Sequence, residues 1–186
     1  MRLFVAIPLP PELANRASTI LPSSLPGLRR VKPENLHITL AFLGWTPEEE
    51  LAAVTEAAIE AAAPVSGFTL DFDRAGRFPE RGRPRVVWLG MAAGALSVIK
   101  LGVGVQAGLR SRRVHFDDRP LAPHLTLARV DEDASSAEAK TVAAALEGIA
   151  VVDFRFEVGE IAVVQSVLSP KGPRYTALAT VPLAHS

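Results

Sequence analysis

The chain has 186 residues and contains no cysteine. This absence excludes disulfide bonds, thiolate nucleophiles and cysteine metal ligands, because each of them requires a thiol. It is also typical of proteins that work in a reducing compartment, so we predict a cytoplasmic location. Any reactive group must be sought among the hydroxyl, imidazole, carboxylate and basic side chains.

The sequence also lacks a net charge and a long apolar run. Its 20 Lys and Arg residues balance its 20 Asp and Glu residues. Because non-specific nucleic-acid binding depends on many contacts between cations and phosphates, we expect weak adhesion to long nucleic acids. No stretch reaches the roughly 18 consecutive apolar residues that span a bilayer, so we expect no membrane attachment. With 48% hydrophobic and 22% charged residues, the composition is that of a globular domain.

Two short segments of the chain are near copies of each other. Motif 1 is His37–Leu40, which reads HITL, and motif 2 is His124–Leu127, which reads HLTL. In an extended strand, side chains two residues apart leave the same face, so each motif presents an imidazole and a hydroxyl side by side. If the two strands face each other across a cleft, two imidazoles and two hydroxyls meet at one point.

Strand-like and helix-like patterns alternate along the chain and predict an α+β fold. We expect strands at 3–7, 36–44, 68–72, 86–89, 121–130, 153–165 and 175–181, and helices near 10–20, 46–63, 93–109 and 135–149. Each motif strand is followed by a helix with a capping-box pattern and then by further strands. This echo predicts an internal duplication with two similar lobes, in which residues 1–186 form a single domain.

The paired motif is suited to acid–base chemistry at a phosphate. The ordinary pKa of histidine is about 6.5, so one imidazole can be neutral while another is protonated. The neutral ring can take a proton from water, and the protonated ring can give one to a leaving oxygen. Thr39 and Thr126 can donate hydrogen bonds to phosphate oxygens, and Arg129 can stabilise the growing negative charge. This scheme requires no metal and no cofactor.

The two histidines also have other interpretations. A single histidine in an apolar strand is more often a structural residue with a satisfied hydrogen bond, but the duplication argues against this for the pair. Imidazole is also a common zinc ligand. The sequence offers no cysteine, no H-x-x-x-H pattern and no carboxylate beside either histidine, which disfavours zinc.

The motifs and their flanks resemble the two-histidine phosphoesterases. The resemblance rests on Asn35–Gly44 and Pro123–Arg129, with supporting stretches at 76–79, 83–90 and 172–183, so it covers nearly the whole chain. Within this superfamily the sequence is most similar to the RNA 2′,3′-cyclic phosphodiesterases, also called 2′-5′ RNA ligases. The resemblance implies a bilobal α+β fold with pseudo-twofold symmetry, antiparallel sheets, helices on the outside and a central cleft lined by the motif strands.

The resemblance also implies an activity and roles for the residues. The activity is metal-independent hydrolysis of the 2′,3′-cyclic phosphate at an RNA end to a 2′-phosphomonoester, which reversible 2′-5′ ligation can accompany. His37 is then the proton donor and His124 the proton acceptor, although the symmetry of the pair allows the reverse. Thr39, Thr126 and Arg129 bind the phosphate. The expected partners are RNA ends or nucleotides with this cyclic phosphate, and a monomer without an obligate protein partner suffices.

Phe42 is the candidate for recognising the terminal base. It lies just after motif 1, and an aromatic ring can stack on a base. It is five residues from His37, however, and an ideal strand would send its side chain to the opposite face, as a core residue. Relatives often have an aromatic residue shortly before motif 1, where this chain has Arg30, so the base-recognition surface stays open.

Two other functions fit the same sequence. One is a phosphodiesterase that acts on small cyclic nucleotides or on 2′-5′ oligonucleotides, and it would use the same pair of histidines. The other is a non-catalytic module that binds RNA ends. Such a module has no need of both imidazoles, so the intact pair favours an enzyme.

Overall fold

The structure is a computed structural model that describes residues 1–170 and 172–184. The strands in this part of the chain are β1 (Arg2–Pro8), β2 (Leu28–Arg30), β3 (His37–Trp45), β4 (Phe68–Phe78), β5 (Val86–Ala93), β6 (Leu125–Val130), β7 (Phe154–Val158), β8 (Glu160–Ser169) and β9 (Gly172–Pro182). The α-helices are α1 (Pro11–Ser18), α2 (Leu51–Ala62), α3 (Ala95–Ser111) and α4 (Ser136–Leu146). Two 3₁₀ turns, η1 (Pro33–Asn35) and η2 (Glu48–Glu50), precede β3 and α2.

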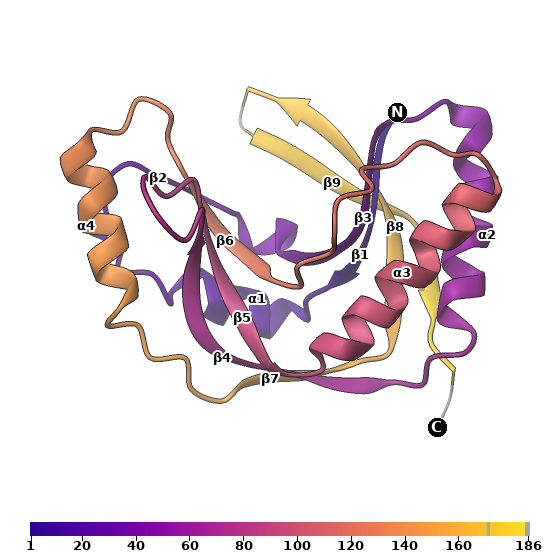
Figure 1. Cartoon of the computed structure of the whole chain (residues 1–186), viewed down its shortest axis with the longest axis horizontal. Helices are drawn as coiled ribbons and strands as arrows, with labels where there is room; N and C mark the ends of the chain where they lie inside the picture. The colour runs from indigo at the N-terminus through magenta and orange to yellow at the C-terminus, as the bar shows by residue number, and fades with distance from the viewer. Residues whose placement is uncertain (171, 185–186) are drawn as a thin grey trace.

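The strands form two antiparallel sheets, one in each lobe (Figure 1). Sheet A has the order β3-β1-β8-β9, and sheet B has the order β2-β6-β5-β4-β7. Helices α2 and α3 cover the outer side of sheet A, and α4 lies outside sheet B (Figure 1). The motif strands β3 and β6 belong to different sheets and contact each other where the lobes meet. The expected bilobal α+β fold is therefore confirmed.

The chain passes repeatedly from one lobe to the other. Strands β1 and β3 lie in sheet A, whereas β2, which lies between them in sequence, belongs to sheet B. The central strand β1 is buried on both faces over residues 3–7, so it forms part of the core of sheet A. Neither half of the sequence builds a lobe alone, and the internal duplication stays a prediction.

Strand β3 contains a bulge that changes which side chains share a face. Against β1, Ala41 pairs with Val5 and Thr39 pairs with Ala6, which leaves Leu40 without a partner. Leu40 and the next residue are therefore both buried, and the alternation is shifted by one residue. As a result the side chain of Phe42 returns to the face that carries the motif 1 histidine, which an ideal strand would not allow.

Strand β6 contains the same irregularity at the equivalent place. Against β5, Ala128 pairs with Val87 and Thr126 pairs with Trp88, so Leu127 has no partner. Leu127 and Ala128 are both buried, and the residue after them faces outward again. Arg129 thus reaches the face of the motif 2 histidine. Because both bulges sit three and four residues after the histidine, they place Phe42 and Arg129 at matching positions in the two lobes.

Three predicted boundaries are wrong. The segment 153–165 is not one strand: it breaks at Gly159 into β7 and β8, which lie in different sheets. The strand expected at 121–130 starts only at Leu125, because Pro120 and Pro123 have no N–H to give to a sheet ladder. The helix expected from residue 46 begins as η2 and becomes α-helical at Leu51. Thr46 does not cap it but donates from its hydroxyl to the carbonyl of Gly44.

Two expectations about helices are confirmed. The capping box at Ser135 and Glu138 is present, with each side chain accepting from the backbone N–H of the other residue. Helix α3 forms despite its three glycines, of which Gly104 and Gly108 lie against α2. A Cβ on Gly108 would lie 2.9 Å from the Cβ of Ala57. The glycines therefore cost helix propensity but let the two helices approach.

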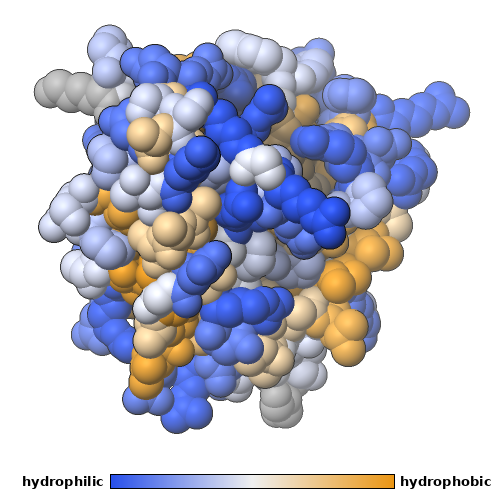
Figure 2. Space-filling model, turned by 60° about the vertical axis from the view of Figure 1, so that its left-hand side comes forward, coloured by the Kyte–Doolittle hydropathy of each residue, from blue (hydrophilic) through white to orange (hydrophobic). Residues whose placement is uncertain are grey.

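The surface has the polar character expected of a globular domain. Figure 2 shows that the face on the side of the sheet B lobe is predominantly hydrophilic, with small apolar areas between charged and polar residues. In the described part of the chain, no helix has both the length and the apolar character that crossing a membrane requires.

Candidate active site

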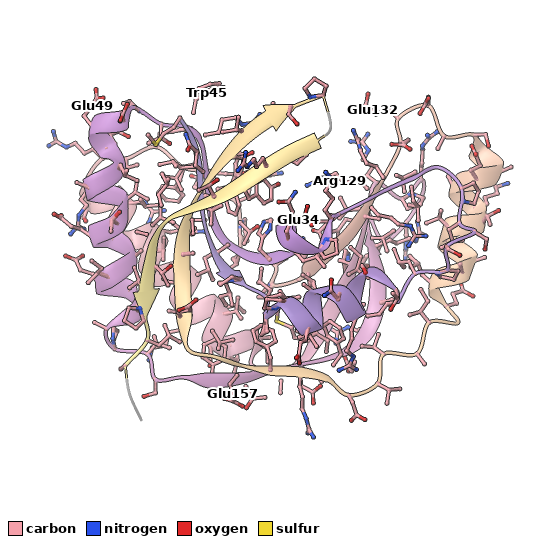
Figure 3. All side chains as sticks on the ribbon, turned by 180° about the vertical axis from the view of Figure 1, so that it is seen from behind. Glu34, Trp45, Glu49, Arg129, Glu132 and Glu157 are labelled. Carbon is pink, nitrogen blue, oxygen red and sulfur yellow. The ribbon has the colours of Figure 1, made fainter. Side chains whose placement is uncertain are left out.

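A cleft of about 550 Å³ lies where the two motif strands meet. Every residue that the sequence predicted for the site lines it: His37, Thr39, Phe42, His124, Thr126 and Arg129. His37 is the first residue of β3, whereas His124 directly precedes β6. Figure 3 shows Arg129 between the lobes, beneath the hairpin of β8 and β9. The structure therefore brings the two motifs together at one place.

Both imidazoles are held in the same tautomer by the backbone. Nδ1 of His37 lies 2.7 Å from the carbonyl oxygen of Asn35, and Nδ1 of His124 lies 2.6 Å from the carbonyl oxygen of Ala122. Because a carbonyl oxygen only accepts, Nδ1 carries a proton in each ring. Nε2 is left to accept a proton when the ring is neutral and to donate one when it is charged. Both rings can thus serve as acid or base toward a molecule in the cleft.

Asn35 is a site residue that the sequence did not single out. Its side chain is buried, and its Nδ2 donates to the carbonyl of Pro173 at the start of β9, at 2.8 Å. This bond fixes the residue whose own carbonyl orients the motif 1 imidazole. The sequence shows Asn35 only as part of the motif flank, since its partner is 138 residues away.

Aromatic rings surround the His37 imidazole on two sides. The ring of Phe4 lies 4.7 Å from that of His37, and the ring of Tyr175 lies 5.4 Å away with its edge toward it. Phe4 and Tyr175 also contact each other. These contacts limit the rotation of the imidazole, as expected for a group that must keep one orientation.

Burial lowers the pKa of both histidines below the ordinary value of 6.5. For His37, loss of hydration is the largest cause, the carbonyl of Asn35 opposes it, and repulsion from His124 and Arg129 lowers the pKa further. For His124, burial again dominates, its carbonyl partner opposes it, and Arg129 adds repulsion. A proton on one ring therefore disfavours a proton on the other. Repulsion thus disfavours the doubly protonated pair, and acid–base catalysis uses the state with one proton.

His124 is supported by a second layer of aromatic residues. The ring of Phe78 lies 5.1 Å from the imidazole, nearly perpendicular to it, and the ring of Trp88 lies 5.1 Å from that of Phe78. The indole in turn lies on Gly76 of the neighbouring strand, where a Cβ would be only 2.3 Å from Cη2 of Trp88. Glycine is thus required at this position for the indole to lie flat against the sheet.

We expect Gly76→Ala to lower both stability and activity. The added methyl group must displace the indole of Trp88, and overpacking of this kind costs about 1–3 kcal/mol of unfolding free energy. Movement of Trp88 and Phe78 also removes the support of His124, so kcat should fall more than KM changes. Denaturant unfolding and steady-state kinetics test this. Gly159→Ala is the control, because a Cβ there meets no atom within 4 Å. If the two variants had the same unfolding free energy and the same kcat, the role of the indole would be contradicted.

The cleft also contains residues that sequence analysis missed. Asp117 and Arg119 come from the loop between α3 and β6, and Gln106 comes from α3. Phe4 reaches it from sheet A, and so does Tyr175, which belongs to the stretch 172–183 that supported the family resemblance. The loop residues lie in no regular element, so no periodic pattern marked them as facing the site.

Two lobes that bring two His-x-Thr segments to one cleft define a two-histidine phosphoesterase. The sequence signature of the LigT-like phosphoesterases matches residues 7–88 and 95–175. The chain belongs to this family.

Relatives from other organisms are similar over almost the entire chain. The RNA 2′,3′-cyclic phosphodiesterase of Archaeoglobus fulgidus is 35% identical over 183 residues, which cover 96% of this chain and 98% of that protein. Among solved structures, TT0787 of Thermus thermophilus has a TM-score of 0.79 at 31% identity and covers 100% of this chain and 99% of its own. Escherichia coli LigT complexed with 3′-AMP has a TM-score of 0.76 at 29% identity, covering 99% and 98%.

Proposed function

We propose that this protein hydrolyses the 2′,3′-cyclic phosphate at the end of an RNA to a 2′-phosphomonoester. The observation that carries the proposal is the convergence of two imidazoles with matching Nδ1 hydrogen bonds on one cleft, together with two hydroxyls and a guanidinium. The names of the relatives support the substrate. The E. coli relative has also been solved with 3′-AMP and with phosphate. We place the reaction in the cytoplasm, with the monomer as the working form.

In this mechanism water attacks phosphorus as the bond to the ribose 3′ oxygen breaks. Nε2 of His124 takes a proton from the water, and the protonated Nε2 of His37 gives one to the departing 3′ oxygen. The phosphate stays on the 2′ oxygen. Thr39 and Thr126 donate to the non-bridging oxygens, and Arg129 stabilises the charge that grows on them. If a 5′-hydroxyl replaces water, the same exchange of bonds forms a 2′-5′ linkage.

Phe42 is proposed to stack on the terminal base. Its ring lines the cleft and remains 42% exposed, which leaves a free apolar face beside the motif 1 residues. Base stacking on an aromatic side chain contributes about 1–3 kcal/mol and tolerates any base. Phe42 therefore supplies affinity without strict sequence preference.

The direct test is the product formed from an RNA that ends in a 2′,3′-cyclic phosphate. We expect a 2′-phosphate, formed at the same rate with and without a strong chelator. Within residues 1–170 and 172–184, no group of three or more His, Cys, Asp or Glu side chains is arranged to hold a metal ion. A 3′-phosphate product would mean that the 2′ oxygen is the leaving group and not the 3′ oxygen. Loss of activity with the chelator would refute the metal-independent mechanism.

The pH dependence follows from the two histidines. One must be neutral and the other protonated, so kcat/KM should follow a bell-shaped curve. Burial and Arg129 lower both pKa values in the free protein, so the optimum of kcat/KM should lie below pH 6.5. A bound anionic phosphate favours the protonated ring, so the alkaline limb of kcat should lie at higher pH than that of kcat/KM. An alkaline limb of kcat/KM well above pH 6.5 would contradict this assignment.

A further inference from the structure

One ion pair at the cleft has no part in the mechanism above. Asp117 and Arg119 lie in the loop between α3 and β6 and line the same cleft as both motif histidines. The loop is attached to motif strand β3, because the backbone N–H of Asp117 donates to the carbonyl of Phe42 at 2.8 Å. The pair is thus held beside the residue that we propose to stack on the terminal base.

The geometry of the pair leaves part of the guanidinium free. Nε of Arg119 lies 2.9 and 3.0 Å from the two carboxylate oxygens of Asp117, and Nη2 lies 2.5 Å from Oδ2. Within the described residues, Nη1 has no hydrogen-bond partner. The side chain of Arg119 is 84% exposed and that of Asp117 only 28%. Asp117 therefore anchors the guanidinium from the protein side and leaves its other edge open.

The cleft holds one guanidinium more than the reacting phosphate uses. Its lining contains one carboxylate, that of Asp117, and two guanidiniums, those of Arg119 and Arg129. The Arg119 guanidinium holds the pKa of Asp117 below its usual range, so this carboxylate remains ionised and paired. Arg129 stands in the same strand as Thr126 and serves the reacting phosphate. The second guanidinium, that of Arg119, lies on the Phe42 side of the cleft and can bind a second phosphate through its free edge.

A cyclic mononucleotide without a 5′-phosphate has only the cyclic phosphate, whereas an RNA end has a further phosphate in its backbone. The phosphodiester on the 5′ side of the terminal nucleotide is one nucleotide away from the reacting group. An arginine presents N–H donors in a planar fork that matches phosphate oxygens. Phe42 and Arg119 line the same cleft, and the backbone of Asp117 joins the Arg119 loop to Phe42. A phosphate bound by Arg119 would therefore lie near a base stacked on Phe42.

We propose that Arg119 binds the phosphate on the 5′ side of the terminal nucleotide and that Asp117 positions it, so that the site prefers RNA ends to cyclic mononucleotides. This inference rests on the proposed function. It goes beyond that function because the phosphate that Arg119 binds is not the one that reacts. Arg119 acts on affinity, since the contact is the same before and during the reaction.

Three substrates that differ by one group each test the contact. They are adenosine 2′,3′-cyclic phosphate, the same molecule with a 5′-phosphate, and the dinucleotide that ends in the cyclic phosphate. In Arg119→Gln, kcat/KM for the last two should fall about tenfold through KM, as expected for one charge-assisted bond. The value for the first should stay within about twofold. Arg81→Gln removes an exposed arginine that does not line the cleft, and it should match the wild type.

The outcomes separate the two proposals. If kcat/KM of Arg119→Gln falls equally for all three substrates, or for none of them, the proposed role of Arg119 is overturned. A fall in kcat/KM for the dinucleotide alone also overturns it, because it would indicate a contact with the second base. A wild-type protein that hydrolyses none of them overturns the proposed function instead. Binding then decides the inference: by calorimetry, Arg119→Gln should weaken adenosine 2′,5′-bisphosphate about tenfold and leave adenosine 2′-monophosphate unchanged. Equal effects on these two ligands would refute it.

Discussion

His37→Ala and His124→Ala are each expected to reduce kcat on a cyclic-phosphate RNA end by about 10²- to 10⁴-fold. Removal of one ring leaves either the attacking water without a base or the departing oxygen without an acid. The double variant should be little slower than the worse single variant, because the two groups act as a unit. Single-turnover assays with labelled RNA would measure these rates without interference from product release.

A third histidine provides the matched control for these variants. His115 is exposed on the loop after α3 and does not line the cleft. His115→Ala should therefore keep the wild-type rate. Thermal unfolding of all variants shows whether lost activity reflects lost folding. If either motif variant stays folded and retains the wild-type rate, the acid–base mechanism fails.

The repeated motif allowed the main chemistry to be predicted from sequence. Identical spacing of histidine and threonine in two strands is a local pattern, and alternation along each strand places the two side chains on one face. The structure agrees: His37 and Thr39 line the cleft together, as do His124 and Thr126. The pattern did not show how the tautomer of each histidine is fixed. In both motifs the backbone carbonyl two residues before the histidine accepts from Nδ1.

Phe42 and Arg129 show where the same alternation misleads. Counting by two from the histidine puts each of them on the opposite face. The bulges after Thr39 and Thr126 add one residue to each strand and bring both side chains back. A bulge depends on pairing with a partner strand that is distant in sequence, so the local pattern could not reveal it.

The break at Gly159 and the pair formed by Asp117 and Arg119 have a similar explanation. Residues 153–165 read as one continuous strand, but the chain changes sheets there because β7 pairs with β4 and β8 pairs with β1. The ion pair lies in an irregular loop, which the backbone N–H of Asp117 joins to the carbonyl of Phe42 at the cleft. In each case the decisive contacts join segments far apart in the sequence.

Arg129→Ala is expected to lower kcat by about 10²- to 10³-fold, the usual cost of removing a donor that stabilises developing negative charge. Arg129→Lys should recover part of this loss, since it keeps the charge but not the planar fork of donors. Arg29→Ala is the matched control: Arg29 pairs with Arg129 across β2 and β6, but it is bound to Asp131 and does not line the cleft.

Arg129 should also affect the pH profile, and this second effect separates its role from that of a general surface charge. Its guanidinium lowers the pKa of both histidines. Without it, both pKa values rise toward 6.5, so both limbs of the kcat/KM curve should move to higher pH. Because Arg129→Lys keeps the positive charge, its curve should stay near that of the wild type even though kcat falls. If Arg129→Ala lost rate without any movement of the curve, the guanidinium would lie too far from the imidazoles to act on the same phosphate.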